Sequence, residues 1–433
     1  MTNLIMIDCH DLGQHLGCYG WKTVPSPNLD ALAARGVRFA ASFCTAPQCC
    51  PSRATLYTGR HAHANGMFGL AHHPFNWRMH PDEVHLARHL LDAGYTTTQI
   101  GVQHVTDQAV GAIQRLGFQE VWMGDDAQTI GQHAAAFLQS NPPRPFFLNI
   151  GFLEPHRDEN GRFMQAQPDR SLGVEVPPYL PQTPEAEGEF AELQGVIGRM
   201  DRAVGVIWAA LEASGLLDDT WFIFTTDHGI AMPRAKCTMY DPGLETALMM
   251  YARPFGLTGG HVYDELISNV DMVPTILDML DIPAPERLQG RSFANLLRGR
   301  PYTPREFLFA EKTFHTAYEP QRAIRTRRYK LIWNAEVDII NVSGDIMHSP
   351  IFPQMIDQIT VERLPLELYD LQTDPLERQN LITHPDYAKT TQTLRQHLLD
   401  WMQQTGDPLL NGPIASPYYD RALGLLRGER HDL

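Results

Sequence analysis

Short apolar runs alternate with amphipathic stretches through the first two-thirds of the chain. The apolar runs predict buried strands, and the stretches with a period near 3.6 predict helices. The strands are expected at 4–7, 95–100, 146–150 and 221–226, and the helices at 28–35 before Gly36, at 84–93 before Gly94, and at 185–214 as one helix or two. This alternation predicts an α/β fold, with a mainly parallel sheet covered by helices on both faces. In such sheets, functional groups lie beyond the carboxyl ends of the strands.

The pattern changes near residues 296–305, where a helix end is followed by a linker-like stretch. Beyond it lie strand-like runs at 323–325 and 329–333, a turn-rich stretch at 368–375 and a helical stretch at 387–403. We therefore expect a catalytic domain over residues 1–305 and a smaller α+β domain with an antiparallel sheet over residues 306–433.

Composition narrows the possible partners. The 433 residues are 43% hydrophobic and 20% charged, as in ordinary globular proteins. The formal net charge of −15 argues against nucleic acid, so an anionic substrate would need cations concentrated locally. No apolar run is long enough to suggest a membrane span. The first residues resemble a strand and not a signal peptide, so we expect a cytoplasmic location.

One of the six cysteines stands out. The spacing of the cysteines matches no zinc ribbon, and most are expected to be buried apolar residues. Pro51 suits the first turn of a helix and would place Cys49 at a helix N-terminus, where backbone N–H groups favour a thiolate or a bound anion. Arg53 would point toward the same anion. The alternative is a buried cysteine before an ordinary helix.

Polar clusters follow several of the predicted strands. Asp8, His10 and Asp11 end the first strand, and Asp227 and His228 follow the strand at 221–226. Carboxylates and imidazoles so placed can bind a divalent cation, although each cluster alone is also typical of a turn.

The twelve residues 49–60 resemble the signature of the type I, formylglycine-dependent sulfatases of the alkaline phosphatase-like superfamily. The resemblance implies a large mixed, mainly parallel sheet flanked by helices. It also implies that a formylglycine-generating enzyme oxidises Cys49, and that the hydrated aldehyde then acts as the nucleophile.

The resemblance also implies one divalent metal, held by Asp11, Asp227, His228 and residue 49. His10 stands where the family has its first aspartate and Asp8 lies nearby, so the choice between them stays open. Calcium is the first expectation. The imidazole ligand broadens the choice to manganese or zinc.

The remaining catalytic roles are likewise carried over from the family. Arg53 and Lys236 would hold the anion, His156 would protonate the leaving group, and His104 would deprotonate the hydrate. The stretch 101–104 departs from the family because it lacks the usual lysine. Gln103 is a neutral donor that could replace that lysine in substrate binding.

Residues 59–76 resemble the N-sulfoglucosamine sulfohydrolase branch of the family, which suggests a small anionic substrate, a sulfated or sulfamated sugar. His72 and His73 are expected either in the substrate pocket or in a solvated loop. His228 and the missing lysine favour an alternative, a phosphonate monoester or phosphodiester hydrolase. An inactive anion-binding protein is a further alternative of another class, and an oligomer is possible.

Overall fold

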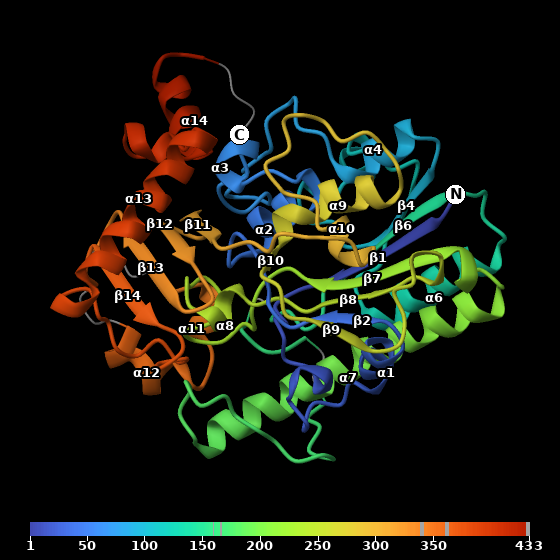
Figure 1. Cartoon of the computed structure of the whole chain (residues 1–433), viewed down its shortest axis with the longest axis horizontal. Coiled ribbons are helices and arrows are strands. Elements are labelled where there is room, and N and C mark those ends of the chain that lie inside the picture. Colours follow the sequence, from blue (N-terminus) through green and yellow to red (C-terminus); the bar gives the residue numbers. More distant parts are fainter. Residues whose placement is uncertain (159, 165–166, 338–341, 360–362, 430–433) are drawn as a thin grey trace.

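Two β-sheets organise the chain (Figure 1). The computed structural model describes residues 1–158, 160–164, 167–337, 342–359 and 363–429. Across these residues, an eight-stranded sheet is formed by strands up to residue 263, and a four-stranded sheet by strands from residue 308 onward. The predicted α/β class and the second, antiparallel sheet are both confirmed.

The large sheet is mixed and mainly parallel. Its central strand β1 pairs in parallel with β6 on one side and with β7 on the other, while β8 runs antiparallel to β7 and β2. The spatial order is β5 (Glu120–Trp122), β4 (Thr96–Gly101), β6 (Phe146–Phe152), β1 (Asn3–Cys9), β7 (Thr220–Thr226), β8 (Leu248–Tyr251), β2 (Val37–Phe39) and β9 (His261–Tyr263).

Both faces of this sheet are buried, which explains the continuous apolar run of β1. Ile5 and Ile7 belong to one hydrophobic cluster, and Leu4 and Met6 belong to the cluster on the opposite face. Figure 1 shows the two groups of helices on either side. Helices α1 (Pro27–Arg35), α6 (Ala127–Gln139) and α7 (Pro184–Ala213) cover the first face, and α2 (Cys49–Thr58), α4 (Leu86–Asp92), α9 (Met272–Met279) and α10 (Ala294–Leu297) cover the second.

The stretch that allowed one helix or two forms the single helix α7. Thr183 caps its start by accepting a hydrogen bond from the backbone N–H of Ala186, and Pro184 occupies its first turn. Shorter elements connect the layers: α3 (Ala62–Asn65), α5 (Val110–Arg115), α8 (Asp241–Leu244), β3 (Ser42–Phe43) and β10 (Ile267–Ser268).

The second sheet is an antiparallel meander. It contains β11 (Leu308–Phe314), β12 (Tyr318–Arg325), β13 (Tyr329–Asn334) and β14 (Leu366–Asp370). Helix α13 (Ala388–Thr405) packs on one face, where Leu394, Leu398 and Trp401 form a cluster with Ile324 and Leu331. The helices α11 (Gly344–Met347) and α12 (Phe352–Ile359) lie between β13 and β14 in sequence.

The start of the stretch predicted to be rich in turns is a strand. Residues 368–370 lie in β14, and the turn begins only at Leu371. Leu368 is buried against α13, while Tyr369 packs on the opposite face. This alternation of buried faces is typical of a strand. The turn-forming residues that follow it led to the prediction of a turn for the whole stretch.

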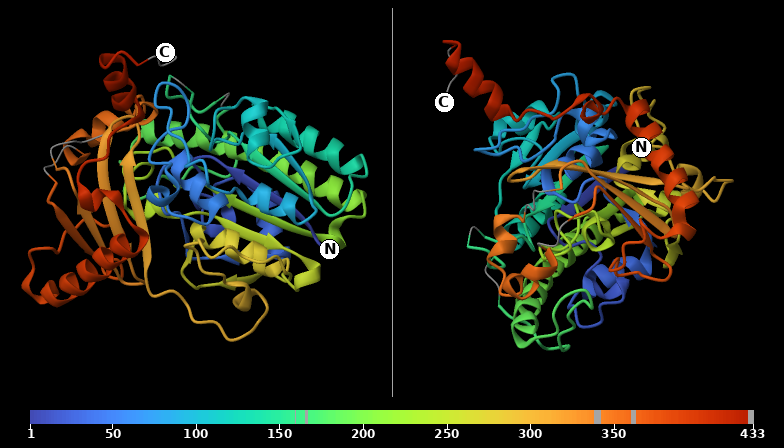
Figure 2. Two further views of the ribbon diagram at one scale, coloured as in Figure 1. Left: turned by 90° about the horizontal axis from the view of Figure 1, so that it is seen from above. Right: turned by 90° about the vertical axis from the view of Figure 1, so that its left-hand side faces the viewer.

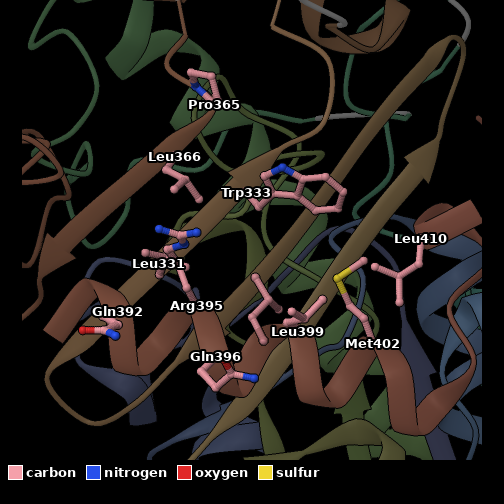
Figure 3. A pocket seen from close by; sticks show the side chains of 11 residues that line it. Leu331, Trp333, Pro365, Leu366, Gln392, Arg395, Gln396, Leu399, Met402 and Leu410 are labelled. Carbon is pink, nitrogen blue, oxygen red and sulfur yellow. The ribbon is translucent and has the colours of Figure 1, made fainter. Parts of the chain in front are cut away.

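The C-terminal part also carries exposed apolar surface. Helix α14 (Pro417–Leu426) projects from the body in Figure 2, and Leu426 is 84% exposed. A groove between α13 and the sheet is lined by Trp333, Leu399 and Met402 (Figure 3). None of the candidate catalytic residues lines this groove.

Within the described residues, no helix has the length and apolar character needed to cross a bilayer.

Candidate active site

The carboxyl ends of β1 and β7 bring two polar clusters together. The backbone N–H of Asp11 donates to Asp227 Oδ1 at 3.0 Å, and His228 Nε2 lies 3.1 Å from Asp11 Oδ1. Gly229 completes this turn because a Cβ at that position would lie 1.8 Å from the carbonyl oxygen of Pro242. Asp11 adopts a left-handed φ of 49°, the kind of backbone strain that concentrates at functional sites.

Helix α2 delivers Cys49 to this cluster. Cys49 is the first residue of the helix, as predicted, and its Sγ lies 3.3 Å from His228 Nε2 and 3.8 Å from Asp11 Oδ1. Burial raises the pKa of the Cys49 thiol well above its ordinary value and outweighs the opposing effect of Lys236. Desolvation by burial is the main cause of this shift.

Arg53 is the central cation of the site. It lies one turn after Cys49, where it donates to Asp8 and, at 3.2 Å, to Asp227 Oδ2. Burial opposes its charge, but pairing with these two carboxylates outweighs burial and raises its pKa. Its Nη2 has no hydrogen-bond partner among the described residues, so one buried donor is left for an anion.

The contacts of Asp8 and His10 bear on which of the two residues would be the further metal ligand. Asp8 accepts hydrogen bonds from Arg53 and Tyr57, and burial raises its pKa despite both partners. His10 is fully buried, and neither of its ring nitrogens has a hydrogen-bond partner among the described residues. His10 Nδ1 lies 3.3 Å from Asp227 Oδ2. This geometry favours His10 as the residue with a free ligand atom.

The donor atoms fit a divalent cation. Ligand atoms of Asp11, Cys49, Asp227 and His228 all lie within 4.8 Å of one another, and His10 belongs to a second such group that shares Asp11 and Cys49. Two carboxylates with one or two imidazoles form a set that binds calcium, manganese or zinc. The Sγ of Cys49 marks the place that an oxygen of the oxidised residue would take.

Lys236 and His156 lie together on the other side of Asp11. Lys236 Nζ donates to Asp11 Oδ2 at 2.7 Å and lies 3.4 Å from His156 Nε2. Burial opposes the charge of Lys236, but Asp11 and Asp345 outweigh it and raise the pKa well above its ordinary value. The side chain of His156 is 24% exposed, so it lies where the buried cluster meets solvent.

The loop after β4 places one predicted residue in the site and holds another away. The His104 ring centroid lies 4.9 Å from that of His10, and burial lowers the pKa of His104 well below the ordinary value. Gln103 instead donates toward His85 at 3.3 Å and accepts from the backbone N–H of Val105 at 2.8 Å. These contacts tie the amide to the N-cap residue of α4 and to its own loop, and among the described residues no contact joins it to the carboxylate and imidazole cluster.

His72 and His73, the two histidines predicted in a pocket or a loop, differ in their position relative to the site. The His72 ring is stacked 5.9 Å from that of His104, at the exposed edge of the site. His73 is exposed, and no contact joins it to the cluster among the described residues. The geometry therefore supports a pocket position for His72 and gives no such support for His73.

Three residues of this site were not predicted. Tyr57 lies one turn beyond Arg53 on the same face of α2, a spacing that could have indicated it. Asp345 and His315 come from the C-terminal part, and no sequence pattern marks them. Asp345 pairs with Lys236 at 2.8 Å, and burial together with Lys236 lowers the pKa of His315 to about 3.

The fold is a mixed, mainly parallel sheet with a cysteine at a helix start, a carboxylate and imidazole cluster at adjacent strand ends, and a buried arginine. This arrangement is that of the alkaline phosphatase-like class of hydrolases. The sequence model of the sulfatase family matches residues 3–282, and that of the N-sulphoglucosamine sulphohydrolase C-terminal region matches residues 232–345. The chain belongs to the sulfatase family and is a hydrolase of the sulfuric ester class.

Individual relatives agree with this assignment. The chain is 31% identical over 462 residues to the N-sulphoglucosamine sulphohydrolase of Homo sapiens, with 95% of this chain and 92% of that protein covered. It is 28% identical over 411 residues to an ulvan-active sulfatase of Formosa agariphila, covering 93% and 80%. The predicted resemblance to the sulfohydrolase branch is confirmed.

Solved structures share the fold. A 2-O GAG sulfatase superposes with a TM-score of 0.76 at 22% identity, covering 96% of this chain and 95% of that one. A phosphonate monoester hydrolase of Agrobacterium radiobacter gives a TM-score of 0.70 at 20% identity, covering 94% and 96%. The scaffold thus serves both kinds of ester, and the side chains of the site must decide between them.

Proposed function

We propose that this chain hydrolyses sulfate esters or sulfamates of a carbohydrate, using formylglycine formed from Cys49 and one divalent metal ion. The observation that carries the proposal is the convergence of Cys49, Arg53 and Lys236 on one buried carboxylate and imidazole cluster. A formylglycine-generating enzyme is the partner that maturation would require.

Asp11, Asp227, His228 and residue 49 would hold the metal, with His10 within reach. The bound ion supplies positive charge that lowers the pKa of a hydroxyl at residue 49 and offsets charge on the substrate. Calcium is our first proposal for the ion. The imidazole donors make manganese and zinc the alternatives, which metal analysis of the purified protein would separate.

The protein side chains would bind the anion and transfer the protons. Arg53 Nη2 and Lys236 Nζ donate hydrogen bonds to the sulfuryl oxygens as their charge develops. One hydroxyl oxygen of hydrated residue 49 would bond to sulfur as the bond between sulfur and the leaving group breaks, and His156, at the solvent edge, gives its proton to the departing oxygen or nitrogen. His104 then takes a proton at residue 49, so that sulfate leaves and the aldehyde returns.

The charge balance of the site favours a monoanionic substrate. Among the described residues, the carboxylates of Asp8, Asp11, Asp227 and Asp345 form ion pairs with Arg53 and Lys236, and His156, which would carry a proton as the general acid, lies 3.7 Å from Asp11. A divalent metal would bring this set close to neutrality. Such a site suits a sulfate ester or sulfamate better than a phosphate monoester, which carries two negative charges.

A phosphonate monoester or phosphodiester is also a monoanion, so this second candidate function remains open to test. Two observations favour it: the imidazole of His228 in the ligand set, and Val102 where the family has a lysine. The relatives named for N-sulphoglucosamine and for ulvan are the reason we place sulfated sugars first.

The deciding experiment compares kcat/KM for N-sulfoglucosamine, a sulfated glucosamine and a phenyl phosphonate monoester, with Cys49→Ala as the matched inactive control. We expect the sugar substrates to exceed the phosphonate by at least about 100-fold, because the site would recognise the sugar as well as the anion. The reverse order would establish the phosphonate activity. Metal binding without turnover of any ester would establish an inactive anion-binding protein.

A further inference from the structure

A carboxylate from the C-terminal part reaches the leaving-group side of the site. Asp345, in α11, places Oδ2 2.8 Å from Lys236 Nζ. The same Nζ lies 3.4 Å from His156 Nε2, the proposed general acid. Asp345 therefore lies beside the position where the departing part of a substrate would be protonated.

Lys236 is paired with two carboxylates. Asp11 already pairs with the same ammonium group at 2.7 Å from inside the cluster. A second carboxylate next to an anion-binding lysine repels a bare sulfate group, at an energetic cost that grows in a buried site. A favourable contact between Asp345 and the substrate would offset this repulsion.

Asp345 retains the capacity for that contact. Its Oδ1 accepts from Ser343 Oγ and, at 3.1 Å, from the backbone N–H of Ile346. Its Oδ2 receives a hydrogen bond from Lys236 alone among the described residues, and a carboxylate oxygen can accept two. The side chain is 11% exposed, so solvent and a substrate hydroxyl can reach it.

We propose that Asp345 is a specificity-determining residue that accepts a hydrogen bond from a sugar hydroxyl adjacent to the sulfated position. This inference rests on the proposed function and deepens it. It assigns to the C-terminal part the selection of substrates whose leaving group carries a hydrogen-bond donor, and it disfavours a bare anion. The competing explanation is that Asp345 merely holds Lys236 in place.

Equilibrium binding separates the two explanations. Metal-loaded Cys49→Ala protein, which cannot turn over, is titrated with N-sulfoglucosamine and with inorganic sulfate, with and without Asp345→Asn. We expect the substitution to weaken sugar binding by about 10- to 100-fold, because a hydrogen bond to a charged acceptor is lost. Sulfate binding should stay equal or become tighter. Asp357→Asn, an exposed carboxylate of the neighbouring helix α12, is the matched control and should change neither.

Parallel weakening of both ligands would overturn the inference, since it would show that Asp345 acts through Lys236. Unchanged sugar binding would overturn it as well. A failure of the proposed function would give a different result from a failure of this inference. Protein carrying formylglycine would hydrolyse no sulfated sugar, and the Cys49→Ala variant would bind no sulfated sugar.

Discussion

Substitutions of Asp8 and His10 test the proposed metal site, because the structure assigns different roles to these neighbouring residues. Asp8 accepts from Arg53 and Tyr57 and is fully buried, so it organises the cation of the site. His10 keeps both ring nitrogens free of hydrogen bonds among the described residues and lies in a ligand group. We predict that Asp8→Asn destabilises the fold but keeps the metal, and that His10→Ala weakens metal binding.

The magnitudes follow from the contacts. Removing one partner of a buried ion pair costs about 3–5 kcal/mol, and Arg53 keeps Asp227, so we take the lower end for Asp8→Asn, about 3 kcal/mol. In a chain of this size, that corresponds to a fall in Tm of roughly 5 °C. For His10→Ala, we expect the metal Kd to rise about 10- to 100-fold, as for loss of a group that supports a metal site.

Thermal unfolding and a metal-competition titration give the two readouts. Tyr57→Phe removes one hydrogen bond from Asp8 and provides a milder variant if Asp8→Asn fails to fold, with a cost of about 1–2 kcal/mol. His15→Ala is the matched control for His10, since His15 is also buried after β1 but lies outside the ligand groups. Loss of metal in Asp8→Asn with retention in His10→Ala would refute the reasoning.

Three further predictions test other parts of the site and fold. Lys236→Met should lower kcat by about 100-fold or more, because a donor to the developing charge is lost, and Lys236→Arg should recover part of it in steady-state assays. Burial lowers the pKa of His85 to about 3, so the folded protein holds it neutral while the unfolded chain protonates it below about pH 6.5. Stability should therefore fall as pH drops below 6.5, by about 2 kcal/mol at pH 5 from this residue, and His85→Asn should flatten the pH profile of urea unfolding. A chelator should lower Tm, by an amount equivalent to about 4 kcal/mol if the free metal had been at a thousandfold excess over its Kd, and re-added metal should restore it; an unchanged Tm would argue against a metal bound to the folded state.

The main sheet could be predicted because its strands are short, fully buried apolar runs separated by helices. The ends of two such strands pointed to Asp11 and Asp227, and the family resemblance added His104 and His156, which also follow predicted strands. Parallel strands deliver their carboxyl ends to one edge, so residues far apart in sequence meet there.

Some features of the site could not be predicted from the sequence, and the reasons are physical. Asp345 reaches Lys236 from a segment 109 positions away, and nothing local in its sequence marks that encounter. Gln103 was proposed as a neutral substitute for the family's missing lysine, and sequence could not show that its amide contacts His85 and the backbone of Val105. The pKa of the Cys49 thiol is raised by burial, which a helix start in the sequence alone does not reveal.

The most direct test of the central claim is peptide mass spectrometry of protein co-expressed with a formylglycine-generating enzyme. Trypsin should release the peptide between Arg38 and Arg53, which also carries Cys44 and Cys50 as internal controls. The account predicts a mass loss of about 18 Da that fragment ions place at Cys49 and at neither neighbour. This is the change expected when the thiol-bearing carbon becomes an aldehyde, whose hydrate is the proposed nucleophile. An intact thiol at Cys49 in protein that hydrolyses sulfated sugars would contradict it.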